Sequence, residues 1–161
     1  LVGQGIDLAL RFGELADSSM KSRKLGVNRR LVCAAPDYLK LNGTPRHPDD
    51  LAHHNCLIMR FGAITDQDWI FTVNGEKRAC RVYGNRIAND GGLIRAWCLN
   101  GYGVALKSEW DVRNDLQAGR LVELLEPFAV EPSALQMVYP AGAVQPRRVR
   151  ALMDYLSKAL Q

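Results

Sequence analysis

The stretch Asn89-Asp90-Gly91-Gly92, the apolar run after it, and the return Gly101-Tyr102-Gly103-Val104-Ala105-Leu106 decide the fold class of this chain. This order predicts the end of a strand, a helix with an open first turn, and a tight return into a buried strand. Asn89 or Asp90 can cap the helix, because a short side-chain oxygen accepts an orphan backbone N–H. Gly91 and Gly92 leave the other N–H groups uncovered, which suits an anion or a polar ligand. The alternative is a capped core helix whose glycines serve only the turns.

The composition is that of an ordinary soluble globular protein. Its 161 residues are 47% hydrophobic and 24% charged, with a formal net charge of +4. This length suits one domain or two small lobes. No apolar run approaches the length of a membrane span, and no signal peptide is recognisable, so we expect no membrane partner. The basic residues are scattered, which favours solvated faces over a nucleic-acid surface.

The motifs of common catalytic and metal sites are missing. Cys33, Cys56, Cys80 and Cys98 form no C-x-x-C pair, which predicts free thiols in a reducing cytoplasm. The three histidines fall in one polar stretch without further ligands at suitable spacing, so no metal is expected. No nucleophile elbow, phosphate-binding loop or dinucleotide fingerprint is present. The sequence therefore predicts neither an enzyme nor a cofactor.

Strand and helix patterns alternate along the chain. Asn74-Gly75 between two apolar runs is a strong hairpin signal. The polar stretch 17–24 is expected to be irregular. The alternation argues for an open α/β sheet, mostly parallel, with one hairpin inserted. The remaining expected strands are 6–11, 30–35, 56–60, 85–89, 121–124 and 135–139, and the expected helices are 37–41, 48–52, 93–98, 109–118 and a last one from about 146.

Ligands of open α/β sheets lie outside the carboxyl ends of the strands. Three segments meet that rule in the expected order of elements. They are Arg11-Phe12-Gly13, Arg60-Phe61-Gly62 and Asn89-Asp90-Gly91.

The ordered set of motifs resembles the effector-binding domain of LysR-type transcriptional regulators. Each motif is weak alone, but the series covers nearly the whole chain in the order found in that family. It consists of Gly5-Ile6-Asp7-Leu8-Ala9-Leu10-Arg11-Phe12-Gly13-Glu14-Leu15, Leu31 to Leu39, Gly43-Thr44-Pro45, Pro48 to Leu57, Asn89-Asp90-Gly91, Gly101 to Leu106, Glu109-Trp110 and Gly119-Arg120-Leu121-Val122.

The resemblance implies a fold like that of type II periplasmic binding proteins, with two Rossmann-like α/β lobes. Lobe I would comprise residues 1–28 and 134–161, and lobe II residues 29–133. Two parts of the family pattern are absent from this chain. They are the DNA-binding helix-turn-helix and the opening strand–helix–strand–helix portion of lobe I, so the first lobe is expected to be incomplete.

The same resemblance implies a small-molecule inducer in the cleft between the lobes. Asn89, Asp90 and Gly91 would form hydrogen bonds to it through their backbone and side-chain donors. Arg11 and Arg60 could bind a carboxylate of the effector through charge-assisted hydrogen bonds. The apolar side of the site would be lined by Phe12, Met59 and Phe61, and the strand-end segment that carries Phe12 adds Gly13. Lys107 stands where the family commonly has proline, and we expect it to lie at a strand end.

The full regulator would be a cytoplasmic homo-oligomer, a dimer by family expectation, that reaches DNA only through its N-terminal domain. Three rival functions remain open from sequence alone. A small α/β enzyme would share the fold class, which hosts many chemistries. A solute-binding receptor would also share the fold but would face an oxidising compartment. A pure dimerisation fragment would show no ligand effect.

Overall fold

The computed structural model describes residues 6–12, 20–141 and 145–159. The chain divides into two compact units, the first formed by residues 1–28 and 132–161 and the second by residues 29–131. Each unit has its own hydrophobic core within the described residues. The two units are therefore described separately.

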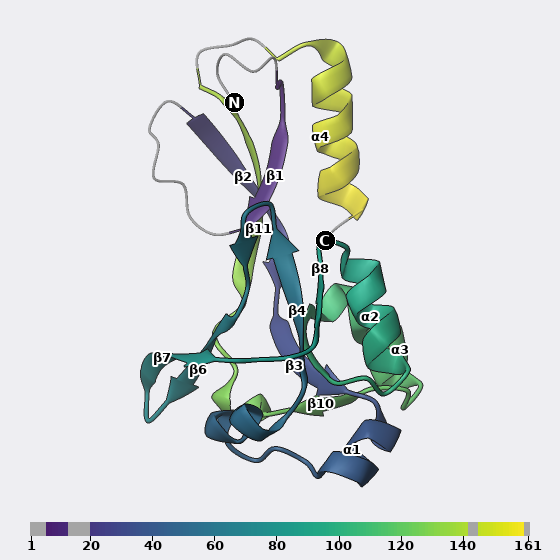
Figure 1. The fold of residues 1–161 in the computed structure, drawn as a ribbon. Coiled ribbons are helices and arrows are strands. Elements are labelled where there is room, and N and C mark those ends of the chain that lie inside the picture. Colours follow the sequence, from purple (N-terminus) through teal and green to yellow (C-terminus); the bar gives the residue numbers. More distant parts are fainter. Residues whose placement is uncertain (1–5, 13–19, 142–144, 160–161) are drawn as a thin grey trace. The chain divides into compact units, whose positions relative to one another are not determined.

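Unit 1 is a three-stranded antiparallel sheet covered by one helix (Figure 1). The strand order is β1 (Ala9–Phe12), β11 (Ser133–Pro140) and β2 (Met20–Asn28). Helix α4 (Arg147–Ala159) packs on the sheet through a periodic apolar face, as the sequence predicts for the last helix. The core residues are Leu25, Leu135, Met137, Val149 and Met153.

Strand β2 corrects one sequence prediction. The stretch 17–24 is expected to be irregular, but residues from Met20 onward form a strand paired with β11, and residues 17–19 lie outside the described part. None of the first five residues of β2, 20–24, is buried, so they do not alternate between a buried and an exposed face. The buried residues of this strand are Leu25 and Asn28. The strand is therefore made by its backbone pairing with a distant segment, which a local polar pattern does not reveal.

Unit 2 is built on a six-stranded sheet. Strands β4, β8 and β9 pair in parallel, and β10 runs the same way because both β9 and β10 are antiparallel to β3. The prediction of a mostly parallel sheet is therefore met only by the pairings of β4 with β8 and β9, because β10–β3, β3–β9 and β4–β5 pair antiparallel. It is wrong for unit 1, whose described pairings are all antiparallel. The path is β10 (Val122–Leu124), β3 (Arg30–Ala34), β9 (Val104–Ser108), β4 (Cys56–Phe61) and β5 (Ile64–Thr65), with β8 (Arg86–Ala88) beside β4.

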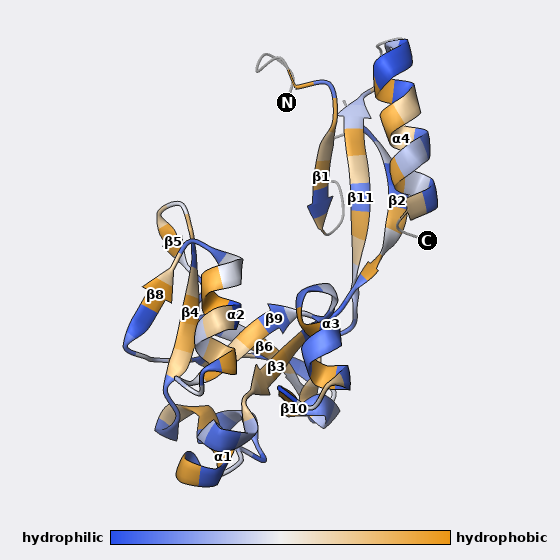
Figure 2. Cartoon of the chain, turned by 90° about the vertical axis from the view of Figure 1, so that its right-hand side faces the viewer, coloured by the Kyte–Doolittle hydropathy of each residue, from blue (hydrophilic) through white to orange (hydrophobic). Residues whose placement is uncertain are grey.

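The central strands of unit 2 are buried on both faces, as the apolar run 30–35 predicts. Leu31 and Cys33 pack toward helices α2 (Gly91–Leu99) and α3 (Glu109–Gln117). Val32 and Ala34 pack toward the opposite layer. That layer contains α1 (Pro36–Asn42), the 3₁₀ helices η1 (Pro48–His53) and η2 (Glu126–Phe128), and the hairpin of β6 (Asp68–Val73) and β7 (Glu76–Arg81). Figure 2 shows the hydrophobic residues concentrated on β3, β4 and β9.

The predicted hairpin is confirmed. Strands β6 and β7 pair in antiparallel register about Asn74-Gly75, with Val73 opposite Glu76. Asn74 and Gly75 have φ values of 54° and 82°, the left-handed conformations that a two-residue turn of this kind requires. The local sequence therefore determines this element fully.

Two glycines allow the backbone to crowd the start of β4. A Cβ on Gly103 would lie 2.3 Å from the carbonyl oxygen of Asn55, and a Cβ on Gly84 would lie 1.8 Å from that of Cys56. The same oxygen of Asn55 accepts the N–H of Val104 at 2.9 Å. Only glycine permits this close approach of the two backbones. The approach helps to fix the register of β9 against β4, and with it the position of Lys107 near the other end of β9.

Candidate functional site

The carboxyl ends of β4 and β8 bring two of the predicted segments to one edge of the sheet. Met59 pairs with Ala88 in parallel register. Arg60 and Phe61 are the last residues of β4. They therefore lie at the same edge of the sheet as Asn89 and Asp90, which follow β8, and Gly91, which begins α2. The short connection leads directly into α2, so the predicted polar turn lies where ligands of open α/β sheets bind.

The first turn of α2 is open, as predicted. Asp90 is the N-cap: its Oδ1 accepts the N–H of Leu93 at 2.8 Å, and its carbonyl accepts the N–H of Ile94 at 3.2 Å. Among the described residues, no hydrogen-bond acceptor is found for the N–H groups of Gly91 and Gly92. The side chain of Asn89 is exposed beside them. Two orphan donors and the positive end of the helix dipole thus face outward together.

Strand β4 separates its predicted site residues between two faces. Leu57 and Met59 pack with Ile94 and Cys98 on the face covered by α2. Side chains alternate along a strand, so Phe61, which is 58% exposed, continues that face. Arg60 lies on the opposite face, exposed, and its guanidinium has no hydrogen-bond or ion-pair partner among the described residues. The structure thus brings Met59 and Phe61, but not Arg60, to the face of β4 on which α2 packs.

Lys107 is the cation that contacts the first turn of α2. It lies near the end of β9, and its side chain is only 8% exposed. The Nζ donates to the carbonyl oxygen of Gly91 at 2.7 Å and pairs with Asp111 Oδ2 at 2.5 Å. The sequence allows Lys107 either to reach the cleft or to lie at a strand end, and favours the strand end. The available signal was a lysine inside an apolar strand with an aspartate four residues later.

A buried carboxylate fastens α3 to α2 below this site. Asp115 is fully buried; its Oδ2 accepts from Arg95 Nε at 2.6 Å, and its Oδ1 accepts from Arg120 Nη2 at 2.7 Å. Burial alone would raise the pKa of Asp115, but the hydrogen bonds from both guanidinium groups outweigh it and lower this pKa. This cluster joins the two helices, and because two guanidinium groups share one carboxylate, a positive charge remains on it.

The remaining predicted site residues belong to unit 1. Arg11 and Phe12 end β1, and both are exposed. Arg11 lies opposite Gln136 of β11, and no described residue pairs with its guanidinium. Phe12 is 50% exposed. Gly13 lies outside the described residues.

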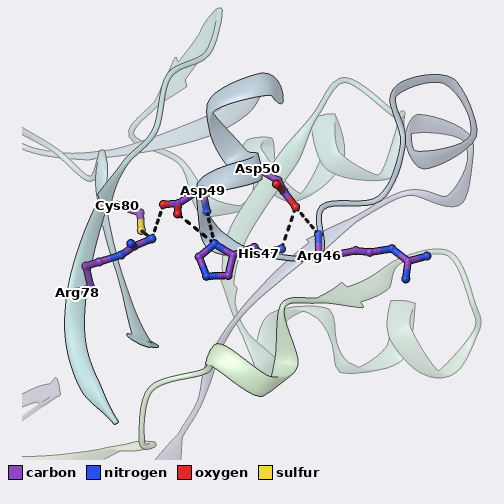
Figure 3. Close-up of polar contacts among 6 residues, drawn as sticks. All are labelled: Arg46, His47, Asp49, Asp50, Arg78 and Cys80. Carbon is purple, nitrogen blue, oxygen red and sulfur yellow. Dashed lines mark hydrogen bonds and ion pairs between the residues drawn. The ribbon is translucent and has the colours of Figure 1, made fainter. Parts of the chain in front are cut away.

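A second polar cluster lines a pocket of about 310 Å³ between β7 and η1 (Figure 3). Arg78 pairs with Asp49 and donates to Cys80 Sγ at 3.6 Å, while Asp49 also contacts His47. Arg81, which lines the same pocket, pairs with Asp68 at 2.9 Å. Each arginine has a carboxylate partner, and the Arg78–Asp49 pair ties the hairpin to η1, while the buried Nε of Arg78 has no partner among the described residues.

Neither a metal site nor a membrane span emerges from the described part of the chain. Within it, no group of three or more histidine, cysteine or acidic side chains could hold a metal ion. Its helices are too short or too polar to cross a bilayer. Cys33, Cys56 and Cys98 are buried free thiols, and Cys80 is a partly exposed one. Burial raises the pKa of Cys56 to about 12, so that thiol stays protonated and inert.

Comparison with known proteins identifies related sequences. The family model described as the LysR substrate binding domain matches residues 1–161. The transcriptional regulator DmlR of Escherichia coli is 32% identical over 156 residues, which is 97% of this chain and 50% of that protein. The regulator CrgA of Neisseria meningitidis is 32% identical over 164 residues, 99% of this chain and 53% of that protein. The chain therefore spans about half the length of these relatives.

Solved structures of regulators have the same fold. The regulatory domain of CrgA superposes with a TM-score of 0.83 at 31% identity, covering 100% of this chain and 78% of that domain. The full-length AphB structure from Vibrio cholerae gives a TM-score of 0.80 at 27% identity, covering 96% of this chain and 52% of that protein. The architecture is thus the α/β fold of type II periplasmic binding proteins, as the sequence predicts.

Proposed function

The chain belongs to the LysR substrate-binding domain family, and we propose that it senses an anionic small molecule at the first turn of α2. The members it matches are transcriptional regulators, so the chain is an effector-binding domain and not an enzyme. The rival functions of a small α/β enzyme and a solute receptor gain no support from these relatives.

The observation that carries the proposal is the pair of orphan N–H donors on Gly91 and Gly92. They lie at the carboxyl edge of β4 and β8, with Asn89 exposed beside them. A buried ammonium, that of Lys107, contacts the same turn. Backbone donors, the helix dipole and a nearby cation all favour negative charge, which supports a carboxylate as the binding group.

The wider site follows from the family architecture. We assign residues 1–28 and 134–161 to lobe I and residues 29–133 to lobe II of the effector-binding domain. Met59 and Phe61 would supply apolar contacts from lobe II. Arg11, Phe12 and Gly13 of lobe I and Arg60 of lobe II are the further residues that we propose for effector binding. A ligand that binds both lobes shifts their arrangement only by its differential affinity for the two states.

The longer protein would use this shift to control transcription. We propose that it is a cytoplasmic homo-oligomer, most simply a dimer, that binds DNA through a helix-turn-helix domain outside this chain. Effector binding would then re-space the DNA-binding domains of the assembly. The relatives' role as transcriptional regulators supports this assignment.

A thermal-shift screen of this chain against aromatic and aliphatic carboxylates tests the proposal. A ligand that binds only the folded state stabilises it by RT ln(1 + [L]/Kd), so the melting temperature rises with ligand concentration even beyond saturation. We expect a concentration-dependent rise that Asn89→Ala abolishes. Asn114→Ala is the matched control, because Asn114 is also an exposed asparagine but lies on α3. A rise retained by Asn89→Ala and lost in Asn114→Ala would contradict the assigned site.

A further inference from the structure

Lys107 occupies an electrostatically costly position. Its side chain is 8% exposed, and burying an ammonium costs several kcal/mol unless partners compensate it. It also lies at the N-terminal end of α2, where the helix dipole disfavours a cation. The hydrogen bond to Gly91 and the ion pair with Asp111 offset these costs and hold the ammonium between the first turns of α2 and α3.

The contacts of Lys107 connect it to the proposed binding turn. The Nζ donates to the carbonyl of Gly91, the first residue of α2. A Cβ on Gly91 would lie 3.3 Å from this Nζ, a tight contact that shows how closely the ammonium approaches the turn. The hydrogen bond thus fixes the residue whose own N–H faces the proposed effector.

The counter-ion of Lys107 is only partly buried. Asp111 lies 2.5 Å from the Nζ but is 39% exposed, on the first turn of α3. Water therefore screens this carboxylate more than it screens the ammonium. Asp115 is the other nearby carboxylate on α3, but Arg95 and Arg120 already neutralise it. The positive charge beneath the α2 turn is therefore only partly compensated.

We propose that Lys107 is a positioning and specificity-determining residue of the effector site: it holds the first turn of α2 through Gly91 and makes that turn select an anion over a neutral analogue. This inference rests on the proposed function and adds a residue to that site. Lys107 acts through the α2 turn and through its field, without touching the ligand. Asp111 opposes it, because its carboxylate competes with that of the effector.

The first test measures positioning without any ligand. Amide hydrogen exchange is followed by NMR in the chain and in Lys107→Met, Lys107→Arg and Lys40→Met. We expect the amides of Leu93 and Ile94 to exchange about tenfold faster in Lys107→Met, because the turn they close is no longer held. Asn100, at the other end of α2, should not change. Lys40→Met is the control, since Lys40 is 73% exposed and paired with Asp37.

The second test measures selectivity with benzoate and benzamide, and with succinate and succinamide, by calorimetry. We expect Lys107→Met to lower the preference for acid over amide about tenfold and Lys107→Arg to retain most of it. Asp111→Asn should raise the preference severalfold. A purely structural ion pair would predict a change of the same sign from both substitutions, since each breaks the same contact.

The outcomes separate the two proposals. Unchanged exchange of Leu93 and Ile94 in Lys107→Met would overturn the positioning role. Changes of the same sign in Lys107→Met and Asp111→Asn would overturn the specificity role. If the unsubstituted chain binds none of the four probes, the carboxylate site of the proposed function fails and the specificity role with it, whereas the exchange result still decides the positioning role.

Discussion

The first turn of α2 and the pocket beside Arg78 present similar polar groups in unit 2 but differ in pairing. In the pocket, Arg78 and Arg81 each have a carboxylate partner. At the α2 turn, the Gly91 and Gly92 backbone donors have no partner among the described residues, and Lys107, which is paired with Asp111, is a far more buried cation than either arginine. The two regions therefore differ in the burial of the cation and in the unpartnered backbone donors of the helix turn, because both contain cation–carboxylate pairs.

The largest loss of unfolding free energy is expected at the buried carboxylate of Asp115. Asp115→Ala leaves the guanidinium groups of Arg95 and Arg120 without their shared acceptor. Breaking such a buried pair costs about 3 kcal/mol or more of unfolding free energy. Chemical denaturation of the isolated chain measures this loss. Asp37→Ala is the control, because Asp37 is 85% exposed and its ion pair with Lys40 should contribute little. Equal losses in both variants would break the comparison.

The pH dependence of stability sharpens the same contrast. The pKa of Asp115 is lower in the folded chain than its ordinary value, despite burial, because Arg95 and Arg120 bond its carboxylate. The contribution of the ionised Asp115 side chain to the unfolding free energy is therefore fully present above the pKa of the unfolded chain, near 4. This contribution is lost as the pH falls through the pKa of the folded chain. We expect the stability gap between the chain and Asp115→Asn to shrink below about pH 4. A gap that widens on acidification would contradict this account.

An intermediate effect is expected at the cap of α2. Asp90→Ala removes the acceptor of the Leu93 N–H and should cost about 1 kcal/mol of unfolding free energy. It should also weaken carboxylate binding, because the frayed turn no longer presents Gly91 and Gly92 together. Calorimetry and thermal unfolding of the same preparations measure both quantities. Asp90→Ser, which restores a capping oxygen, should recover the stability.

The smallest effect is expected in the pocket. Asp49→Ala removes a carboxylate that is 64% exposed from an arginine that is 42% exposed, so the loss of unfolding free energy should stay below about 1 kcal/mol. Carboxylate binding to the chain should not change. A loss of binding in Asp49→Ala equal to that in Asn89→Ala would show that the two clusters form one functional region.

The sequence predicts best where structure is determined locally. The hairpin at Asn74-Gly75 and the cap at Asp90 depend on the conformations of adjacent residues, and both appear as predicted. The two-sided burial of β3 follows from a short apolar run. The strand from Met20 was missed because a distant strand makes its hydrogen bonds.

The candidate site could be only partly predicted for the same reason. The polar turn 89–91 and its neighbours on β4 were found from the rule on strand ends. The opposite orientation of Arg60 required the packing of Met59 against α2 to be known. The lysine within an apolar strand and Asp111 four positions later indicate an ion pair, but the contact of Lys107 with Gly91, sixteen positions away, depends on the packing of β9 beside α2.

The most direct test of the account is an NMR titration of the isolated chain with benzoate and succinate. The account predicts that the largest amide shifts occur at Gly91, Gly92 and Leu93 and saturate with added acid. Saturable shifts centred instead on Arg78, Ala79 and Arg81 would contradict it, because they would place the anion in the pocket whose charges are already paired.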